Sequence, residues 1–205
     1  MIKLHAHFMM GILVLMAVLI TSCSPVSIPN STTYQLTSVV PPSNASVKKP
    51  SNQSLLVSLP QATAGYDTDK MAYILHPYEL GYFTKNQWVD EPRRMLEPLI
   101  AESLQNTHQF SAVTEAPFSG FTDLRLDTTL LELHQNFLTN PSQVELVVDV
   151  RLVKCSSQRI IAGKRFSITV PALQNTPYGG VQAANQAVAI FLQQLIKFIP
   201  EASHL

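Results

Sequence analysis

The segment that decides the fold is Val144-Glu145-Leu146-Val147-Val148-Asp149-Val150-Arg151-Leu152. Every second side chain in it is apolar, and three of the four between them are charged. This period of two is typical of a β-strand with one buried face. Alternation of this kind is common in antiparallel sheets, where one face packs on the core and the other meets water or a partner.

The neighbouring segments extend this pattern into a sheet. Alternation from Leu124 shifts phase at Leu131, which predicts a β-bulge. After a turn at 156–159, a third strand places on one face Ile160, Ala162, Phe166, Ile168 and Val170. On the outer face of the strand that begins at Val144, two apolar residues, Val147 and Val153, lie among charged residues. A half-apolar outer face of this kind is compatible with a homo-oligomer.

The remaining elements predict an α+β fold. Shorter strands are expected at 55–59, 70–76 and 80–84, and a helix capped by Asp90, with Pro92 in its first turn, at about 92–107. A second helix at 180–199 carries one apolar stripe and ends before Pro200. We therefore predict a mainly antiparallel sheet with two amphipathic helices packed on one face.

The N-terminus predicts a secretory signal. Lys3 precedes thirteen uncharged residues, 8–20, which are too few for a helix that must cross a bilayer. The tetrad Ile20-Thr21-Ser22-Cys23 follows and resembles the lipobox of bacterial lipoproteins. That resemblance implies cleavage between Ser22 and Cys23 and acylation of Cys23, the covalent lipid being the only cofactor expected. An uncleaved signal anchor is the alternative. An aspartate directly after the lipidated cysteine resembles an inner-membrane retention signal, so Ser24 at that position favours the outer membrane.

A polar region separates this signal from the folded part. Ser, Thr, Pro and Asn make up 19 of the 31 residues from Ser24 to Ser54, a composition that resists regular structure. We therefore expect a signal peptide at 1–22, a lipidated flexible tether at 23–54 and an α+β domain at 55–205. The tether could span several tens of Å, and its one candidate strand is 33–40.

Little in the sequence indicates chemistry. Fourteen basic and fourteen acidic residues give a net charge of zero, which excludes the basic footprint of a nucleic-acid binder. The sequence has no phosphate-binding glycine loop, and His76, His108, His134 and His204 show no metal-ligand spacing. We expect no catalytic residue, no metal and no enzyme activity. A periplasmic enzyme, which needs a pocket with a nucleophile or an acid–base pair, stays as an alternative.

The order of these features resembles the ABC-type transport auxiliary lipoprotein family. The resemblance rests on the lipobox, Tyr34-Gln35-Leu36, the strand before Pro60, Gln87-Trp88 with Glu91-Pro92 before a helix, and three strands followed by a final helix. The segment Gln61–Tyr66 departs from the family pattern, which leaves any partner contact there in doubt.

The family resemblance implies a role in lipid traffic across the cell envelope. It implies an outer-membrane lipoprotein, anchored on the periplasmic face, that docks an MCE-domain periplasmic protein, with an inner-membrane permease and ATPase as indirect partners. A lipoprotein adaptor of another envelope machine, for secretion or cell-wall synthesis, is the alternative. Three residues are candidates for partner contact. Tyr34 and Leu36 are expected to add an edge strand to the domain or to a partner, and Trp88 to be a buried anchor or a partner hot spot.

Overall fold

Nine strands and two helices form the part of the chain that the computed structural model describes, residues 31–37 and 51–203. The strands are β1 (Thr32–Tyr34), β2 (Ser54–Val57), β3 (Gln61–Ala62), β4 (Lys70–Ile74), β5 (Gly81–Trp88), β6 (Ala112–Glu115), β7 (Leu124–Asn136), β8 (Gln143–Lys154) and β9 (Arg159–Pro171). The helices are α2 (Pro92–Gln105) and α3 (Pro177–Ser203).

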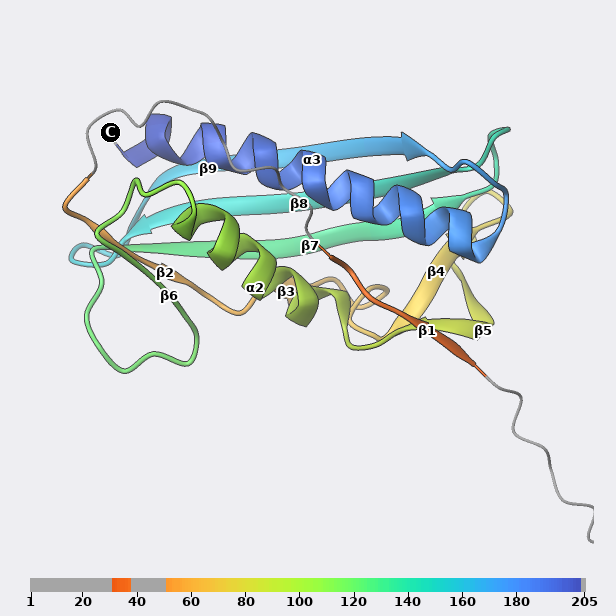
Figure 1. Ribbon diagram of the computed structural model, residues 1–205, viewed down its shortest axis with the longest axis horizontal. Helices are drawn as coiled ribbons and strands as arrows, with labels where there is room; N and C mark the ends of the chain where they lie inside the picture. Colours follow the sequence, from red (N-terminus) through yellow and green to blue (C-terminus); the bar gives the residue numbers. More distant parts are fainter. Residues whose placement is uncertain (1–30, 38–50, 204–205) are drawn as a thin grey trace, which may run out of the picture. The chain divides into compact units, whose positions relative to one another are not determined.

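Strands β7, β8 and β9 form the antiparallel part of the sheet that the alternating segments predict (Figure 1). The inward side chains of β8 are buried, as expected from the sequence: Val144, Leu146, Val148, Val150 and Leu152. The register of β7 against β8 shifts between Leu130 and Glu132, which confirms the bulge predicted at Leu131.

The other edge of β7 is built from three short strands. β2, β3 and β4 pair with β7 one after another, all parallel to it. β6 then adds in parallel to β2, β5 adds antiparallel to β4, and β1 adds in parallel to β5. The sheet is therefore mixed: its longest pairings are antiparallel, and most of its short ones are parallel.

Both helices cover the same face of the sheet (Figure 1). α3 packs mainly on β8 and β9, α2 packs on β6 and β2, and the two helices touch. The apolar stripe of α3 is buried in the core, including Val188, Phe191, Leu192 and Leu195. The fold class and the helix placement predicted from the sequence are thus confirmed. None of the helices in the described residues is long and apolar enough to cross a membrane.

Four details differ from the predictions. α3 runs from Pro177 to Ser203, so it does not end before Pro200 as predicted. α2 has Glu91 rather than Asp90 at its N-cap, because the Asp90 carboxylate accepts a hydrogen bond from the adjacent N–H of Glu91 (2.8 Å) and does not reach into the helix. A register shift between Leu152 and Val153 buries Val153, which was expected on the outer face, and leaves Ile160 57% exposed. The short strands β3 and β6 were not predicted.

Candidate interaction surfaces

One end of the sheet carries a cluster of aromatic rings. Tyr73, Phe83 and Phe137 lie with ring centroids 4.8 to 6.4 Å apart. The Tyr73 ring lies directly over Gly81, where a Cβ atom would meet it at 2.6 Å. Glycine at 81 therefore permits the close approach of the ring to β5.

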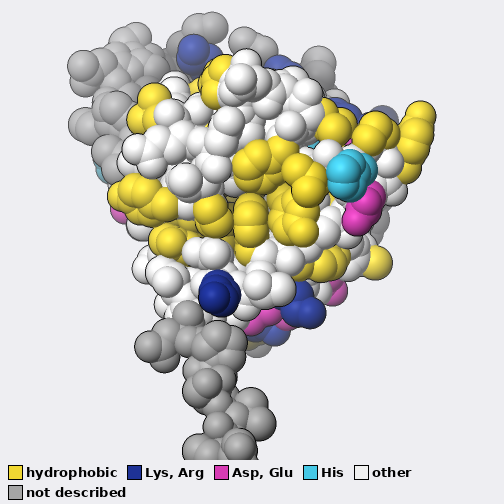
Figure 2. Space-filling view, turned by 90° about the vertical axis from the view of Figure 1, so that its right-hand side faces the viewer, with side chains coloured by type: hydrophobic (Ala, Val, Ile, Leu, Met, Phe, Trp, Pro, Cys, Tyr) yellow, Lys and Arg dark blue, Asp and Glu magenta, His cyan; other side chains and the backbone are white. Residues whose placement is uncertain are grey.

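The strand register brings several exposed apolar residues to this same end. Tyr73 pairs with Gly81, Ile74 with Asn136, and Gln143 with Pro171. The loops after β4, β7 and β9 therefore project together. They carry Leu75, Tyr78, Leu138 and Leu173, which are 50% to 106% exposed. We call the three rings and these four residues the aromatic end, and Figure 2 shows hydrophobic side chains gathered on this side of the molecule.

An open groove of about 300 Å³ lies at the aromatic end. It is lined by Tyr73, Leu75, Tyr82, Phe83, Thr84 and Phe137. Such a lining offers apolar surface and three hydroxyl groups but no acid–base pair. The groove is therefore suited to contact with an apolar partner rather than to the catalysis that the enzyme alternative requires.

Residues 31–37, here called the N-terminal segment, pack onto the folded domain. β1 pairs with β5, and the N–H of Val89 donates to the carbonyl oxygen of Tyr34 (2.7 Å). Asn185 of α3 then holds the main chain on both sides of Leu36, donating to the carbonyl oxygen of Gln35 (3.3 Å) and accepting from the N–H of Thr37 (2.5 Å). The candidate strand thus joins the edge of the chain's own sheet.

Leu36 and Trp88 are core residues in this structure. Leu36 is 2% exposed and Trp88 is 4% exposed, and both belong to the cluster beneath the helices. Tyr34 is half-buried, lies against Tyr178 with ring centroids 6.2 Å apart, and donates a hydrogen bond to Asn86 (3.3 Å). Of the three candidate contact residues, Tyr34 therefore keeps the most surface for a partner. Ser22 and Cys23 lie outside the described residues.

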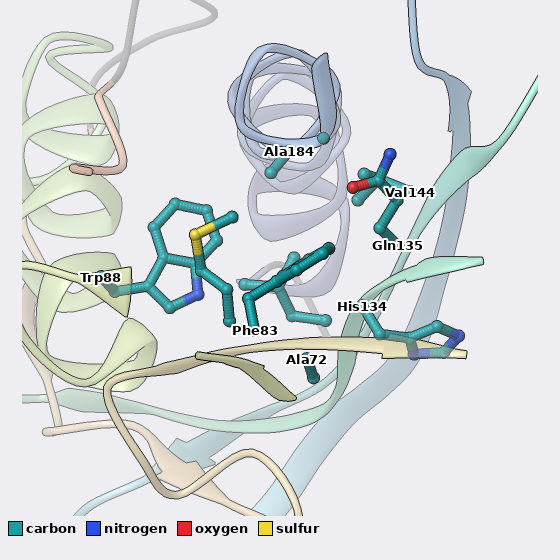
Figure 3. Close-up of a pocket in the computed structure, with 10 residues that line it drawn as sticks. Ala72, Phe83, Trp88, His134, Gln135, Val144 and Ala184 are labelled. Carbon is teal, nitrogen blue, oxygen red and sulfur yellow. The ribbon is translucent and has the colours of Figure 1, made fainter. Parts of the chain in front are cut away.

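The core beside Trp88 is almost completely filled. Figure 3 shows Trp88 and Phe83 of β5 and Ala184 of α3 around a small cavity. Its volume is about 10 Å³, room for one water molecule at most. The imidazole of His134 points away from this cavity, toward the outer face of the sheet (Figure 3). This cavity among the described residues is therefore too small for a lipid chain.

Charged groups on the outer face form ion pairs, one within β7 and one between β9 and β8. Arg125 and Asp127 form an ion pair (2.8 Å), and Arg165 of β9 binds Asp149 of β8 (2.6 Å). The Arg165 guanidinium holds the pKa of the Asp149 carboxyl below its ordinary value. Around His134 the outer face also carries Tyr66, Glu132 and Glu145, a group that the sequence did not indicate. Counting strand register outward from a turn centred between Thr139 and Asn140 would have placed His134 opposite Glu145.

Comparison with solved structures supports the fold. Protein XCC0632 from Xanthomonas campestris is 20% identical, with a TM-score of 0.76, over 84% of this chain and 97% of its own. A second structure, of an uncharacterised protein, is 13% identical with a TM-score of 0.65, over 83% and 99% of the two chains. The PelC dodecamer from Paraburkholderia phytofirmans is 12% identical, over 81% and 92%, with a TM-score of only 0.44.

Sequence comparison identifies the family. No curated protein matches the sequence. The family model described as the ABC-type transport auxiliary lipoprotein component matches residues 34–195, which include every element from Tyr34 to most of α3. The chain therefore belongs to the ABC-type transport auxiliary lipoprotein family.

Proposed function

We propose that this chain is a non-catalytic, lipid-anchored subunit of an MCE and ABC-type lipid transport system. In this proposal it is acylated at Cys23, lies on the periplasmic face of the outer membrane and docks the MCE-domain protein there. The family match over residues 34–195 carries the proposal, because the family is an auxiliary component of ABC-type transport. ATP hydrolysis then belongs to another chain.

The N-terminal segment sets how far the domain can lie from its anchor. Thr32, the first residue of β1, follows Cys23 by nine residues, which span at most about 30 Å when fully extended. β1 runs parallel to β5, whose first residue, Gly81, lies at the aromatic end. The chain therefore enters β1 from the direction of the aromatic end.

This geometry supports an orientation in which the aromatic end faces the bilayer. Tyrosine rings combine an apolar body with a hydroxyl group, which suits the membrane–water interface. Tyr78 is fully exposed, and Leu75 and Leu138 beside it are about half exposed. The polar outer face of the sheet remains free for the protein partner.

Partner capture tests the function. The tagged full-length lipoprotein is crosslinked in cells and purified in mild detergent, with Cys23→Ala as the matched control. We expect an MCE-domain protein among the captured chains. The Cys23→Ala chain should stay unprocessed or leave the membrane fraction and capture less of that partner. Failure to recover an MCE-domain protein would refute the transport role, and a mature, membrane-bound Cys23→Ala chain would refute acylation at Cys23.

Lipid crosslinking tests the orientation separately. A photoreactive benzoylphenylalanine replaces Tyr78 at the aromatic end, or Ser157 in the turn at the opposite end of β8. We expect phospholipid adducts at position 78 and few at position 157. Equal labelling of the two positions would contradict the orientation without affecting the partner-capture result.

A further inference from the structure

Three potential metal ligands meet on the outer face of the sheet. His134 of β7 pairs directly with Glu145 of β8, and Glu132 lies two residues before His134 on the same face. One ligand atom from each side chain lies within 4.8 Å of the other two. Neither carboxylate makes an ion pair with a lysine or arginine among residues 31–37 and 51–203. The two negative charges are thus gathered without a fixed cation.

His134 is held in place but lacks one hydrogen-bond partner. Its side chain is 3% exposed, and its Nδ1 atom lies 2.9 Å from the hydroxyl oxygen of Tyr66, whose ring stacks on the imidazole. Its Nε2 atom is buried without a hydrogen bond to any described residue. A buried polar atom without a partner costs roughly 1–3 kcal/mol, so it calls for an explanation.

The contact between His134 and Tyr66 suits metal binding, because it can occupy Nδ1 and leave Nε2 as the ligand atom. When Nδ1–H donates to the Tyr66 oxygen, the lone pair of Nε2 is directed at the carboxylates. A metal-binding histidine typically donates its other ring N–H in this way.

The ligand spacing also fits. The distance from His134 Nε2 to Glu145 Oε2 is 3.5 Å. Two ligands about 2.0–2.1 Å from a tetrahedral zinc ion lie roughly 3.4 Å apart. The other carboxylate oxygen of Glu145 accepts hydrogen bonds from Asn136 (2.7 Å) and Gln143 (3.1 Å), which fix the carboxylate and leave Oε2 free. Such outer-shell contacts are usual around metal ligands.

We propose that Glu132, His134 and Glu145 bind one divalent transition-metal ion of the zinc class, with a fourth position open to solvent. Imidazole and carboxylate ligands suit zinc, and three protein ligands with one open position is a known zinc arrangement. The ion joins β7 to β8, and through the contact between Tyr66 and His134 it fixes the loop before β4. The site is independent of the transport role proposed above.

Zinc titration of the full-length protein tests this site. The protein is purified in detergent, stripped with a chelator and titrated with zinc by calorimetry, and the bound metal is counted by mass spectrometry. We expect one zinc ion per chain. Glu132→Gln and Glu145→Gln should each weaken binding by about 100-fold or more, and Tyr66→Phe, which removes only an outer-shell contact, by about tenfold. Glu102→Gln, an exposed charge on α2, is the matched control and should bind as the wild type does.

Two outcomes would overturn the proposal. One is a wild-type protein that binds no stoichiometric zinc, and the other is unchanged binding in Glu132→Gln and Glu145→Gln, which would place the ion at other surface groups. Circular dichroism of the metal-free variants checks that they fold. Glu132 is half-exposed, so the test rests on Glu132→Gln if the variants nearer the buried His134 fail to fold.

Discussion

Replacing Leu36 by alanine should release the N-terminal segment while the rest of the domain stays folded. Leu36 is 2% exposed and packs in the core, where a Leu→Ala change typically costs about 2–5 kcal/mol. The hydrogen bonds from Asn185 to residues 35 and 37 remain, so we expect the lower figure, about 2 kcal/mol. Because 1.4 kcal/mol is a factor of ten, the population of released segment should rise roughly 30-fold.

Amide hydrogen exchange of the full-length chain measures this release. Peptides covering 31–37, and the Val89 amide that donates to Tyr34, should exchange about 30-fold faster, whereas peptides from β8 should not change. Gln35→Ala is the matched control, since its side chain is exposed in the same segment. Equal acceleration in β8 would show that the segment unfolds only with the whole domain. No acceleration in 31–37 would show that Leu36 does not hold the segment. Either result would refute this reasoning.

Two further predictions concern stability. A Cβ atom at Gly179 would collide with the main-chain carbonyl oxygen of Gln174, so Gly179→Ala should destabilise the domain by about 1–3 kcal/mol. The control is Gly163→Ala, whose new Cβ atom would have its nearest contact at 3.6 Å and which should change stability by less than about 0.5 kcal/mol. The urea midpoints of the two variants measure the difference, and equal midpoints would contradict the steric argument. Burial lowers the pKa of His134 in the folded state. As the pH falls below the ordinary histidine pKa of about 6.5, the unfolded chain therefore binds a proton at this residue before the folded chain does. The contribution of His134 to stability is full above that pH and is lost as the pH falls below it. Metal-free urea midpoints between about pH 8 and pH 5 should show a smaller fall for His134→Gln than for the wild type, and identical slopes would disprove the assignment.

The sequence predicts the elements whose signals are local. The strand 144–152 and the apolar stripe of α3 each repeat within a few residues, and the bulge at Leu131 shows as a change of phase in the same strand. The pairing of β2 with β7 is different, because it joins Leu55 to Leu124 and leaves no local pattern. β3 and β6 have two and four residues, too few for a period to show.

The surfaces depend on contacts that the sequence does not record. Asn185 lies 148 residues from Thr37, and no spacing rule relates them. His134 and Glu145 become neighbours only once the register of β7 and β8 is known, and Tyr66 reaches His134 from a loop before β4. Histidine spacing along the chain therefore predicted no metal site, although one imidazole and two carboxylates converge in space.

The three parallel strands on the edge of β7 have a consequence for how the domain forms. Leu55 and Val57 of β2 are fully buried, yet their sheet partners Leu124 and Leu126 come 69 residues later. In a chain exported from its N-terminus, β2, β3 and β4 emerge before the strand that they pair with. Contacts of such long sequence separation form slowly and leave apolar strands exposed meanwhile. The sheet can therefore form only after β7 is available, and until then the apolar side chains of the earlier strands are exposed.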